Sequence, residues 1–423
     1  MRLRACLLAI AVVLPLRAFA QTPPPAAPPP APPAEAAPPA APAAPMAPAP
    51  AAVVVAPAPV PPPPPAAPAG PAPKFVFGGL VDTYYLFNFT PPSGANTLQF
   101  PQGFAPAGAL PLVVGRAFDT NANSMTLALA KLTMNASLDP VSFQLDMGYG
   151  SVGTIINNAG GGSAAVGNSF LIEQAFGEIT LPVGLPSFTL DFGKFTTTAG
   201  AEVIEANKNW LYSRSLLFNA IPLLHTGVRA NLKVNDNLTL QASFVNGWNN
   251  DPDLNAWKTG GLSASITVNP MLSIIATTYF GKEAPQGVMP STPGDFRFLG
   301  DLVAALTVNS QFGLNLNVDY IKAFDDVAAD YQIGAALMGR YVISDRLNVA
   351  ARAEFLANHF DTLATTTKQG EGTIMLGIDV GKNFELRPEV RADFAGSVMG
   401  QDLLEGGAKS DAVTGEVAAL VWF

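Results

Sequence analysis

The sequence predicts an all-β fold: a transmembrane antiparallel up-and-down β-barrel of about sixteen strands, preceded by a disordered Pro/Ala-rich N-terminal segment. Three observations support this prediction. Apolar and polar residues alternate with a period of two over most of the chain after residue 74. The connections between the alternating runs are short and long in turn. Charged residues make up 13% of the chain, about half the usual share, while apolar residues reach 49%.

Residues 1–20 have the parts of a secretory signal peptide. Two arginines precede an apolar run from Ala5 to Leu16, and Ala18-Phe19-Ala20 supplies small residues before the expected cleavage at Gln21. A membrane anchor is the alternative, but the run is shorter than the roughly 20 residues that span a bilayer. Cys6 is the one cysteine and lies in this segment, so the mature chain is expected to have no disulfide.

Residues 21–73 consist almost wholly of Ala and Pro, with Glu35 as the only charge. Such a stretch has few backbone donors and no large side chains to bury, so we expect a partly disordered, polyproline-II-like arm. At ~3.1 Å per residue its contour length is on the order of 160 Å, comparable with the depth of a periplasm. We interpret it as a periplasmic tether, which either crosses the peptidoglycan layer or serves only as a spacer.

Residues 74–423 form the predicted barrel domain. Apolar residues occupy every second position from Phe312 to Tyr320, for example. Strands of about ten residues, tilted by ~45°, just cross an apolar band of ~25 Å. Each unpaired backbone group in hydrocarbon costs several kcal/mol, so the sheet must close. Besides the run at Phe312, alternating runs begin near Phe75, Met125, Val141, Gln174, Ser187, His225, Leu238, Gly261, Leu272, Phe298, Tyr331, Leu347, Thr373, Phe384 and Val413.

The short connections all fall at one end of the predicted barrel and the long ones at the other. The short connections contain turn residues and lie at 139–140, 182–186, 235–237, 269–270, 309–311, 344–346 and 381–383. The long connections are 91–124, 150–169, 196–224, 247–259, 281–295, 358–372 and 395–412. Bacterial outer-membrane barrels have this asymmetry, with short periplasmic turns and long extracellular loops.

The stretch from Phe384 to Phe394 shows the alternation most clearly. Leu386, Val390 and Phe394 are expected to face lipid, because turning an Arg toward the bilayer midplane costs ~2–4 kcal/mol. A soluble β-sandwich is the alternative, but the scarcity of charge and the one-sided long loops favour the barrel. The alternate positions, which we expect to face a water-filled lumen, are Glu385, Arg387, Glu389, Arg391 and Asp393.

Both signs of charge are expected on the inner face of the barrel. Facing rows of opposite charge set a transverse field and a size limit, and mixed rows predict weak ion selectivity. The expected members are Lys131, Lys194, Arg229, Arg340, Arg352, Arg387 and Arg391, against Asp146, Glu178, Asp191, Asp319, Glu354, Glu385, Glu389 and Asp393.

The last strand ends on an aromatic pair, Trp422 and Phe423, after alternating apolar residues. Such an ending resembles the signal by which the outer-membrane assembly machinery recognises barrels. Other aromatic residues near strand ends are typical of interfacial belts: Tyr84, Tyr85, Phe87, Phe89, Tyr279 and Phe280.

The connection from Thr196 to Leu224 is unusually apolar for a loop, with a tryptophan and many leucines. Such side chains need a surface to pack on. We therefore hypothesise that this segment folds into the barrel, although an external cap packed on neighbouring loops is the alternative. Its charged residues would then lie at the narrowest part: Glu202, Glu205, Lys208 and Arg214.

The stretch from Asp191 to Ala230 resembles the Putative beta-barrel porin-2 family (OmpL-like). A Gly-Lys-Phe strand end, an Asn-Trp and Ser-Arg-Ser run, and the strand start Pro-Leu-Leu-His-Thr-Gly-Val-Arg follow one another in the order typical of that family. Elsewhere the match is one of pattern only, and the Pro/Ala segment lies outside it. The resemblance implies a Gram-negative outer-membrane porin-type barrel from Phe75 to Phe423 and says little about the solute.

The sequence offers little for catalysis or metal binding. His225 and His359 are the only histidines, so a structural zinc or haem site is not expected, and no cofactor is expected. His359 and Asp361 could imitate a catalytic pair, but we expect no enzymatic activity. Acidic loop clusters, Asp251 with Asp253 and residues 325–330, lack a calcium-binding pattern and are expected to be solvated.

The predicted function is that of an outer-membrane porin, a water-filled channel for passive diffusion of small hydrophilic solutes or ions. The alternative is a structural outer-membrane anchor whose Pro/Ala arm contacts the cell wall. Without Arg2, Arg4, Arg17 and Glu35 the chain keeps 20 basic and 31 acidic residues, so nucleic acid is not an expected partner. Expected partners are outer-membrane lipid, the barrel-assembly machinery, peptidoglycan through residues 21–73, and further copies in a homo-trimer by analogy with other porins.

Overall fold

The computed structural model describes residues 72–90, 114–159, 169–182, 184, 187–253, 255–283, 295–324, 329–361, 364–396, 404 and 410–423. All of them belong to one unit that extends from Ala67 to Phe423. The expected signal peptide and nearly all of the expected Pro/Ala arm lie outside the described residues.

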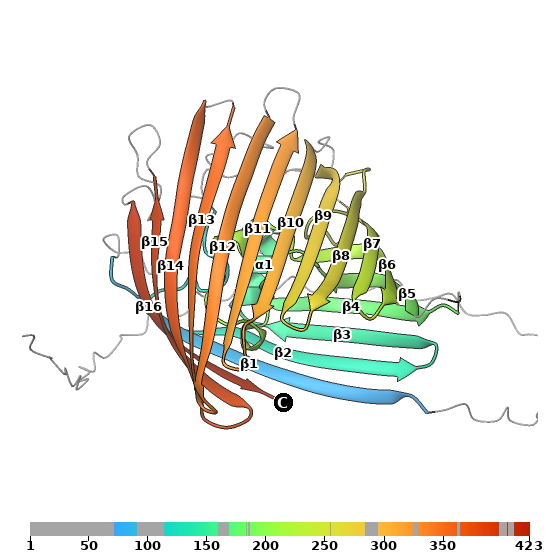
Figure 1. Ribbon diagram of the computed structural model, residues 1–423, viewed down its shortest axis with the longest axis horizontal. Coiled ribbons are helices and arrows are strands. Elements are labelled where there is room, and N and C mark those ends of the chain that lie inside the picture. Colours follow the sequence, from blue (N-terminus) through green and yellow to red (C-terminus); the bar gives the residue numbers. More distant parts are fainter. Residues whose placement is uncertain are drawn as a thin grey trace, which may run out of the picture. The chain divides into compact units, whose positions relative to one another are not determined.

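Sixteen strands within the described part of the chain form one closed antiparallel barrel, as predicted (Figure 1). They are β1 (Lys74–Asn88), β2 (Ser124–Leu138), β3 (Val141–Tyr149), β4 (Phe170–Thr180), β5 (Ser187–Thr196), β6 (Leu224–Asn235), β7 (Leu238–Val245), β8 (Thr259–Asn269), β9 (Leu272–Glu283), β10 (Asp295–Thr307), β11 (Phe312–Phe324), β12 (Ala329–Ser344), β13 (Leu347–Phe360), β14 (Thr365–Asp379), β15 (Phe384–Ala395) and β16 (Asp411–Trp422).

Each strand pairs with its neighbours in sequence, and β1 closes the sheet by pairing with β16. The closing register runs from Leu80 opposite Trp422 to Asn88 opposite Thr414. Closure leaves no sheet edge with unpaired backbone groups. Hydrocarbon imposes this requirement on a β-structure because lipid tails cannot hydrogen-bond to such groups.

The two faces of the barrel differ as the alternation predicts. On β15, Val390 and Phe394 are 50% and 53% exposed, whereas Arg391 between them is 1% exposed. The exposed row of apolar side chains is the outer surface that contacts lipid. The buried row with the charges is the inner surface.

Two of the expected long connections differ from the prediction. The connection after β13 is short, because β13 continues to Phe360 and β14 begins at Thr365 rather than near Thr373. The β-branched run of threonines at 365–367 extends this ladder, with His359 opposite Thr366. The connection after β3 begins with a helix, α1 (Ser151–Ala159), which buries Val152 and Ile156 one helical turn apart.

The connection between β5 and β6 contains a short 3₁₀ helix, η1 (Ala206–Lys208), and a short α-helix, α2 (Leu216–Ala220). None of the helices in the described ranges is long and apolar enough to span a membrane.

The lipid-facing assignment can be tested with one substitution at two positions of the β14–β15 hairpin. Val390→Arg places a charge in the middle of β15, and we expect it to lower the free energy of unfolding by about 2–4 kcal/mol. Val380→Arg, which is the same change at the exposed turn, should cost about 0–1 kcal/mol. Urea unfolding in lipid vesicles measures both. Equal losses for the two variants would contradict the assignment of faces.

Candidate functional site

Residues 197–223, which we call the inner segment, lie inside the barrel. The inner segment makes hydrogen bonds with inward-facing side chains of β1, β2, β9, β11, β13 and β15. These strands are distributed around more than half of the circumference, on both sides of the β1–β16 closure. A cap on the outside could not reach them all, so the segment crosses the lumen.

The apolar side chains of the inner segment pack against the inner wall. Leu211 and Leu217 are fully buried, and they form a cluster with Ala336 and Met338 of β12 and with Leu356 of β13. This burial explains why so apolar a segment does not stay in water, since each buried Leu side chain contributes roughly 1.5–3 kcal/mol.

Two strand carboxylates bind backbone amides of the inner segment. Glu354 on β13 accepts from the N–H groups of Leu216 and Leu217, at 2.7 Å each. Glu389 on β15 accepts from the N–H groups of Tyr212 and Ser213, at 2.8 and 3.1 Å. Amides at the start of a short helix such as α2 have no partner within the helix, so Glu354 supplies what the helix start lacks, while Glu389 binds the amides of the chain just before it.

Strand arginines bind carbonyl oxygens of the same segment. Arg387 donates to the oxygens of Ala206 and Asn209, at 2.7 and 3.0 Å. Arg391 donates to the oxygen of Arg214 at 2.6 Å. Carboxylates of this wall therefore bind backbone amides of the inner segment, and guanidinium groups of the same wall bind its backbone oxygens.

Arg352 on β13 links the inner segment to the wall by two kinds of contact, with carboxylates and with a backbone oxygen. Its guanidinium lies 2.8 Å from a carboxylate oxygen of Glu202, 2.8 Å from the backbone oxygen of Ser213 and 2.5 Å from a carboxylate oxygen of Glu371. Glu202 also accepts from the N–H of Ser215 at 2.8 Å. Such hydrogen-bonded charges tolerate burial that an isolated ion could not.

The charges of β13 and β15 are not hydrated by a watery lumen, contrary to expectation. They lie on the inner face as predicted, but their exposed fractions are only 1–5%. The physical reason is that the inner segment replaces water as the hydrogen-bonding partner of five of them, while Glu385 and Asp393 pair with Arg387 and Arg391. The residues concerned are Arg352, Glu354, Glu385, Arg387, Glu389, Arg391 and Asp393.

A second anchor of the inner segment is the ammonium group of Lys131 on β2. It lies 3.2 Å from Asp146, 2.8 Å from Glu173 and 2.7 Å from Glu205. Burial alone would raise the pKa of Glu205, but the ammonium groups of Lys131 and Lys208 outweigh it and lower that pKa to about 2. The three carboxylates have the spacing of a metal site, with ligand atoms within 4.8 Å of one another. The ammonium group of Lys131 already lies among them.

The four charged residues expected at the narrowest part have different environments. Glu202 and Glu205 are buried and ion-paired, as described above. Arg214 is also buried, and it donates at 3.0 Å to the oxygen of Val203, so it supports the segment's own fold. The side chain of Lys208 is 62% exposed although it pairs with Glu205.

Two residues of β5 and β6 form a further pair on the inner face. Arg229 lies 2.7 Å from Asp191 and 4.3 Å over the ring of Phe195. Lys194 does not join this row, which corrects the prediction. Positions 191 and 194 differ by an odd number and so face opposite sides of a strand, and Lys194 pairs with Asp251 of the β7–β8 connection at 2.6 Å.

A second segment, residues 114–120, was missed as a lumen element. The N–H of Val114 donates to Gln369 on β14 at 2.7 Å, and Arg116 donates to Thr414 on β16 at 2.8 Å. The ring of Phe118 packs edge-on against Phe218 of α2, with ring centroids 5.6 Å apart. The apolar residues of this connection were the available signal, because the argument used for Thr196 to Leu224 applies to them as well.

The two histidines have structural partners. His225 is buried, its Nδ1 lies 2.9 Å from the oxygen of Gly247, and its ring stacks on Tyr279. His359 lies between Asp361 and Thr366, with its ring nitrogens 2.8 Å from an oxygen of each. The acidic loop residues Asp251 and Asp253 are both ion-paired. Asp253 binds Lys258, and Asp251 binds Lys194. Residues 325–328 lie outside the described residues.

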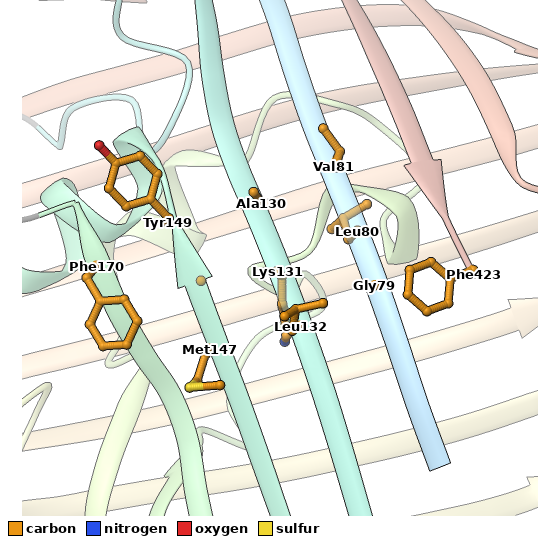
Figure 2. A pocket seen from close by; sticks show the side chains of 11 residues that line it. Gly79, Leu80, Val81, Ala130, Lys131, Leu132, Met147, Tyr149, Phe170 and Phe423 are labelled. Atoms are coloured by element: carbon orange, nitrogen blue, oxygen red, sulfur yellow. The ribbon is translucent and has the colours of Figure 1, made fainter.

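A hollow of about 350 Å³ lies elsewhere, on the outer face near the closure (Figure 2). Its lining includes Leu132, Tyr149 and Phe170, which are 60%, 57% and 49% exposed. Such a largely apolar lining on the lipid-facing surface suits hydrocarbon better than a hydrophilic solute. The hollow is therefore separate from the lumen.

The chain ends at the β1–β16 closure. Phe423 exchanges two backbone hydrogen bonds with Gly79, at 3.1 and 3.2 Å, and its side chain is 74% exposed. Trp422 is half-buried beside it. An exposed terminal ring remains available to a recognising partner, and the assembly role of Trp422 and Phe423 stays a prediction.

The family model described as "Putative beta-barrel porin-2, OmpL-like" matches residues 74–423, which is the whole barrel. The chain belongs to this porin family. It is therefore an outer-membrane channel for passive diffusion, and the resemblance noted at Asp191 to Ala230 is confirmed. No match was found among curated proteins.

Solved structures with the same fold are outer-membrane proteins. The loop L8 deletion mutant of OmpT from Vibrio cholerae has a TM-score of 0.55 at 11% identity, covering 84% of this chain and 100% of that chain. The anion-selective porin from Comamonas acidovorans has a TM-score of 0.54 at 11% identity, covering 83% and 100%. The channel DcaP of Acinetobacter baumannii has a TM-score of 0.52 at 12% identity, covering 83% and 97%. At such identities the likeness shows the fold alone.

The anchoring of the inner segment can be tested at Glu354. Glu354→Gln keeps the shape of the side chain but removes one acceptor and the charge, so an amide of Leu216 or Leu217 loses its partner. We expect the opening free energy of these amides to fall by about 1–3 kcal/mol, measured by hydrogen exchange. Glu178→Gln on β4 is the matched control, since Glu178 is half-buried and bonds to Ser142 rather than to the segment. Unchanged exchange in both variants would contradict the anchoring role.

Proposed function

We propose that this porin passes small hydrophilic solutes through a passage whose width is set by the inner segment, and that it catalyses no reaction. The observation that carries this proposal is the set of hydrogen bonds from residues 197–223 to six strands from within the barrel. A segment held at so many points keeps its position while solutes diffuse past it. It also reduces the cross-section of a sixteen-strand barrel, which would otherwise enclose a wide aqueous lumen.

The twelve residues predicted from sequence to line the constriction divide into two roles in this proposal. Lys208 is the one whose side chain is well exposed, so it would contact solutes directly. The other eleven would act by holding the inner segment in place. Each belongs to the inner segment, binds it, or pairs with a neighbouring charge of the barrel wall: Glu202, Glu205, Arg214, Arg229, Arg352, Glu354, Glu385, Arg387, Glu389, Arg391 and Asp393.

Planar-bilayer recording of the refolded protein tests the proposal. We expect single-channel conductance steps in KCl, and a severalfold larger conductance when residues 203–212 are replaced by a short Gly/Ser linker that cannot cross the lumen. Removing the obstruction widens the path while the strands stay unchanged. Shortening the exposed β7–β8 connection by residues 251–257 is the control, with conductance as in the parent. A protein without conductance steps would refute the channel, and an unchanged conductance of the linker variant would refute the role of the segment.

We further propose that residues 1–20 are removed on export and that residues 21–73 tether the 74–423 barrel to the cell wall from the periplasm. Support comes from composition, since the arm is almost wholly Ala and Pro. Deletion of residues 21–73 should abolish co-sedimentation with peptidoglycan and leave conductance unchanged. If co-sedimentation persists in the deletion variant, the arm is only a spacer.

We also propose that the barrel-assembly machinery reads Trp422 and Phe423, and that the protein forms homo-trimers. A trimer form is known for OmpT of Vibrio cholerae, which has the same fold with a TM-score of 0.52. Light scattering in detergent measures the oligomer. A monomeric mass would overturn the second of these proposals.

A further inference from the structure

The inner wall opposite the buried charges of β13 and β15 carries a continuous row of uncharged hydrogen-bonding side chains. Thr189, Asn231, Gln241, Ser263 and Thr277 are direct register partners in turn across β5 to β9. Thr277 donates to the oxygen of Thr198 in the inner segment, so the row lies on the inner face. We call these five residues the amide–hydroxyl row.

Hydrogen bonds between neighbours fix the amide–hydroxyl row in place. Asn231 donates to Thr189 at 3.2 Å, and Gln241 donates to Asn231 at 2.8 Å. The hydroxyl groups of Ser263 and Thr277 lie 3.0 Å apart. All but Thr277 are half-buried, so they keep contact with solvent, unlike the charges of β13 and β15.

Charges next to the row are ion-paired, hydrogen-bonded or buried. Asp301 on β10 is the register partner of Thr277, and Asp319 on β11 is opposite Asp301; they are only 4% and 1% exposed. Arg229 lies 2.7 Å from Asp191, which is 1% exposed, so this pair adds no net charge to the wall. Glu178 on β4 accepts a hydrogen bond from Ser142, and Lys233 on β6 pairs with Asp236 at 2.8 Å. The solvent-accessible part of this wall is therefore polar and close to electrically neutral.

Such a wall discriminates between solutes by the partners that it offers. An ion that loses part of its hydration shell in a passage needs opposite charge or oriented dipoles in return, and the charges of β13 and β15 that could supply it are only 1–5% exposed. A neutral solute with many hydroxyl groups exchanges its bonds to water for bonds to amides and hydroxyls at little cost.

We propose that solutes pass along the wall that bears the amide–hydroxyl row and that the channel favours neutral polyhydroxylated solutes over charged solutes of the same size. The proposal rests on the channel function proposed above and names its solute class. The sequence predicted weak ion selectivity from mixed rows of charge. The proposed preference differs from that prediction because the charges on β13 and β15 are not accessible to a solute.

Three open-chain solutes with the same carbon skeleton test the preference: neutral sorbitol, anionic gluconate and cationic glucamine. Uptake into vesicles that contain the refolded protein is measured in high salt, which screens the field of distant charges. We expect sorbitol to enter severalfold faster than either ion. Faster or equal entry of gluconate or glucamine would overturn the preference.

A charge placed in the row tests the route. Gln241→Glu is nearly isosteric, and we expect it to shift the reversal potential in a KCl gradient toward that of potassium and to slow gluconate further. Gln311→Glu, in the exposed β10–β11 turn, is the matched control and should behave as the parent. A reversal potential unchanged by Gln241→Glu would show that solutes do not pass along the row.

The channel itself is checked in the same preparation by KCl conductance. Conductance without a preference for sorbitol overturns this inference and leaves the channel function standing. Absence of both conductance and uptake, in protein whose barrel is intact by resistance to unfolding in detergent, overturns both.

Discussion

The structure depends on the mutual satisfaction of two sets of groups that could not be buried separately. The inner segment has amides and carbonyls without partners, and the wall of β13 and β15 has carboxylates and guanidinium groups on its inner face. Glu354 and Glu389 accept from the amides, while Arg352, Arg387 and Arg391 donate to carbonyl oxygens. Removing one partner of such a buried pair leaves the other group unpaired, which costs several kcal/mol where that group is charged and stays buried.

The closed sheet explains why the charges are available for this task. Hydrocarbon outside the barrel accepts only apolar side chains, so alternation along each strand sends the polar ones inward. Ionic residues at every second position of Phe384 to Phe394 are therefore a consequence of the membrane on one side. Their pairing with the inner segment is a consequence of the position of that segment inside the barrel. The membrane sets the register of the strand, and the inner segment determines whether a charge contacts water or backbone.

The barrel could be predicted from sequence because its signals are local. Alternation with a period of two, turn residues at one end and the scarcity of charge each appear within a short stretch of chain. The inward fold of Thr196 to Leu224 followed from its apolar side chains, and residues 114–120 could have been found by the same reasoning. The error at Lys194 was avoidable as well, since the parity of positions within one strand already separates it from Asp191.

The environment of the charges could not be predicted in this way. Whether Arg391 contacts water or the oxygen of Arg214 depends on contacts between residues that are far apart in sequence. The amide–hydroxyl row is invisible for the same reason. Thr189, Asn231, Gln241 and Ser263 are unremarkable in their own strands, and only the register of three neighbouring strand pairings brings them into line.

The same contacts argue that the inner segment is a fixed part of the passage rather than a moving gate. To swing out of the lumen, it would have to leave the carboxylates of Glu354 and Glu389 and the guanidinium group of Arg352 without its backbone. Breaking one such buried pair costs about 3–5 kcal/mol, and water entering the vacated lumen would return part of this. A change between closed and open populations requires a free-energy difference of about 5.5 kcal/mol to be supplied by a ligand or field. Several anchors released together exceed that amount, which supports the proposal that solutes pass beside the segment, along the wall that it leaves uncovered.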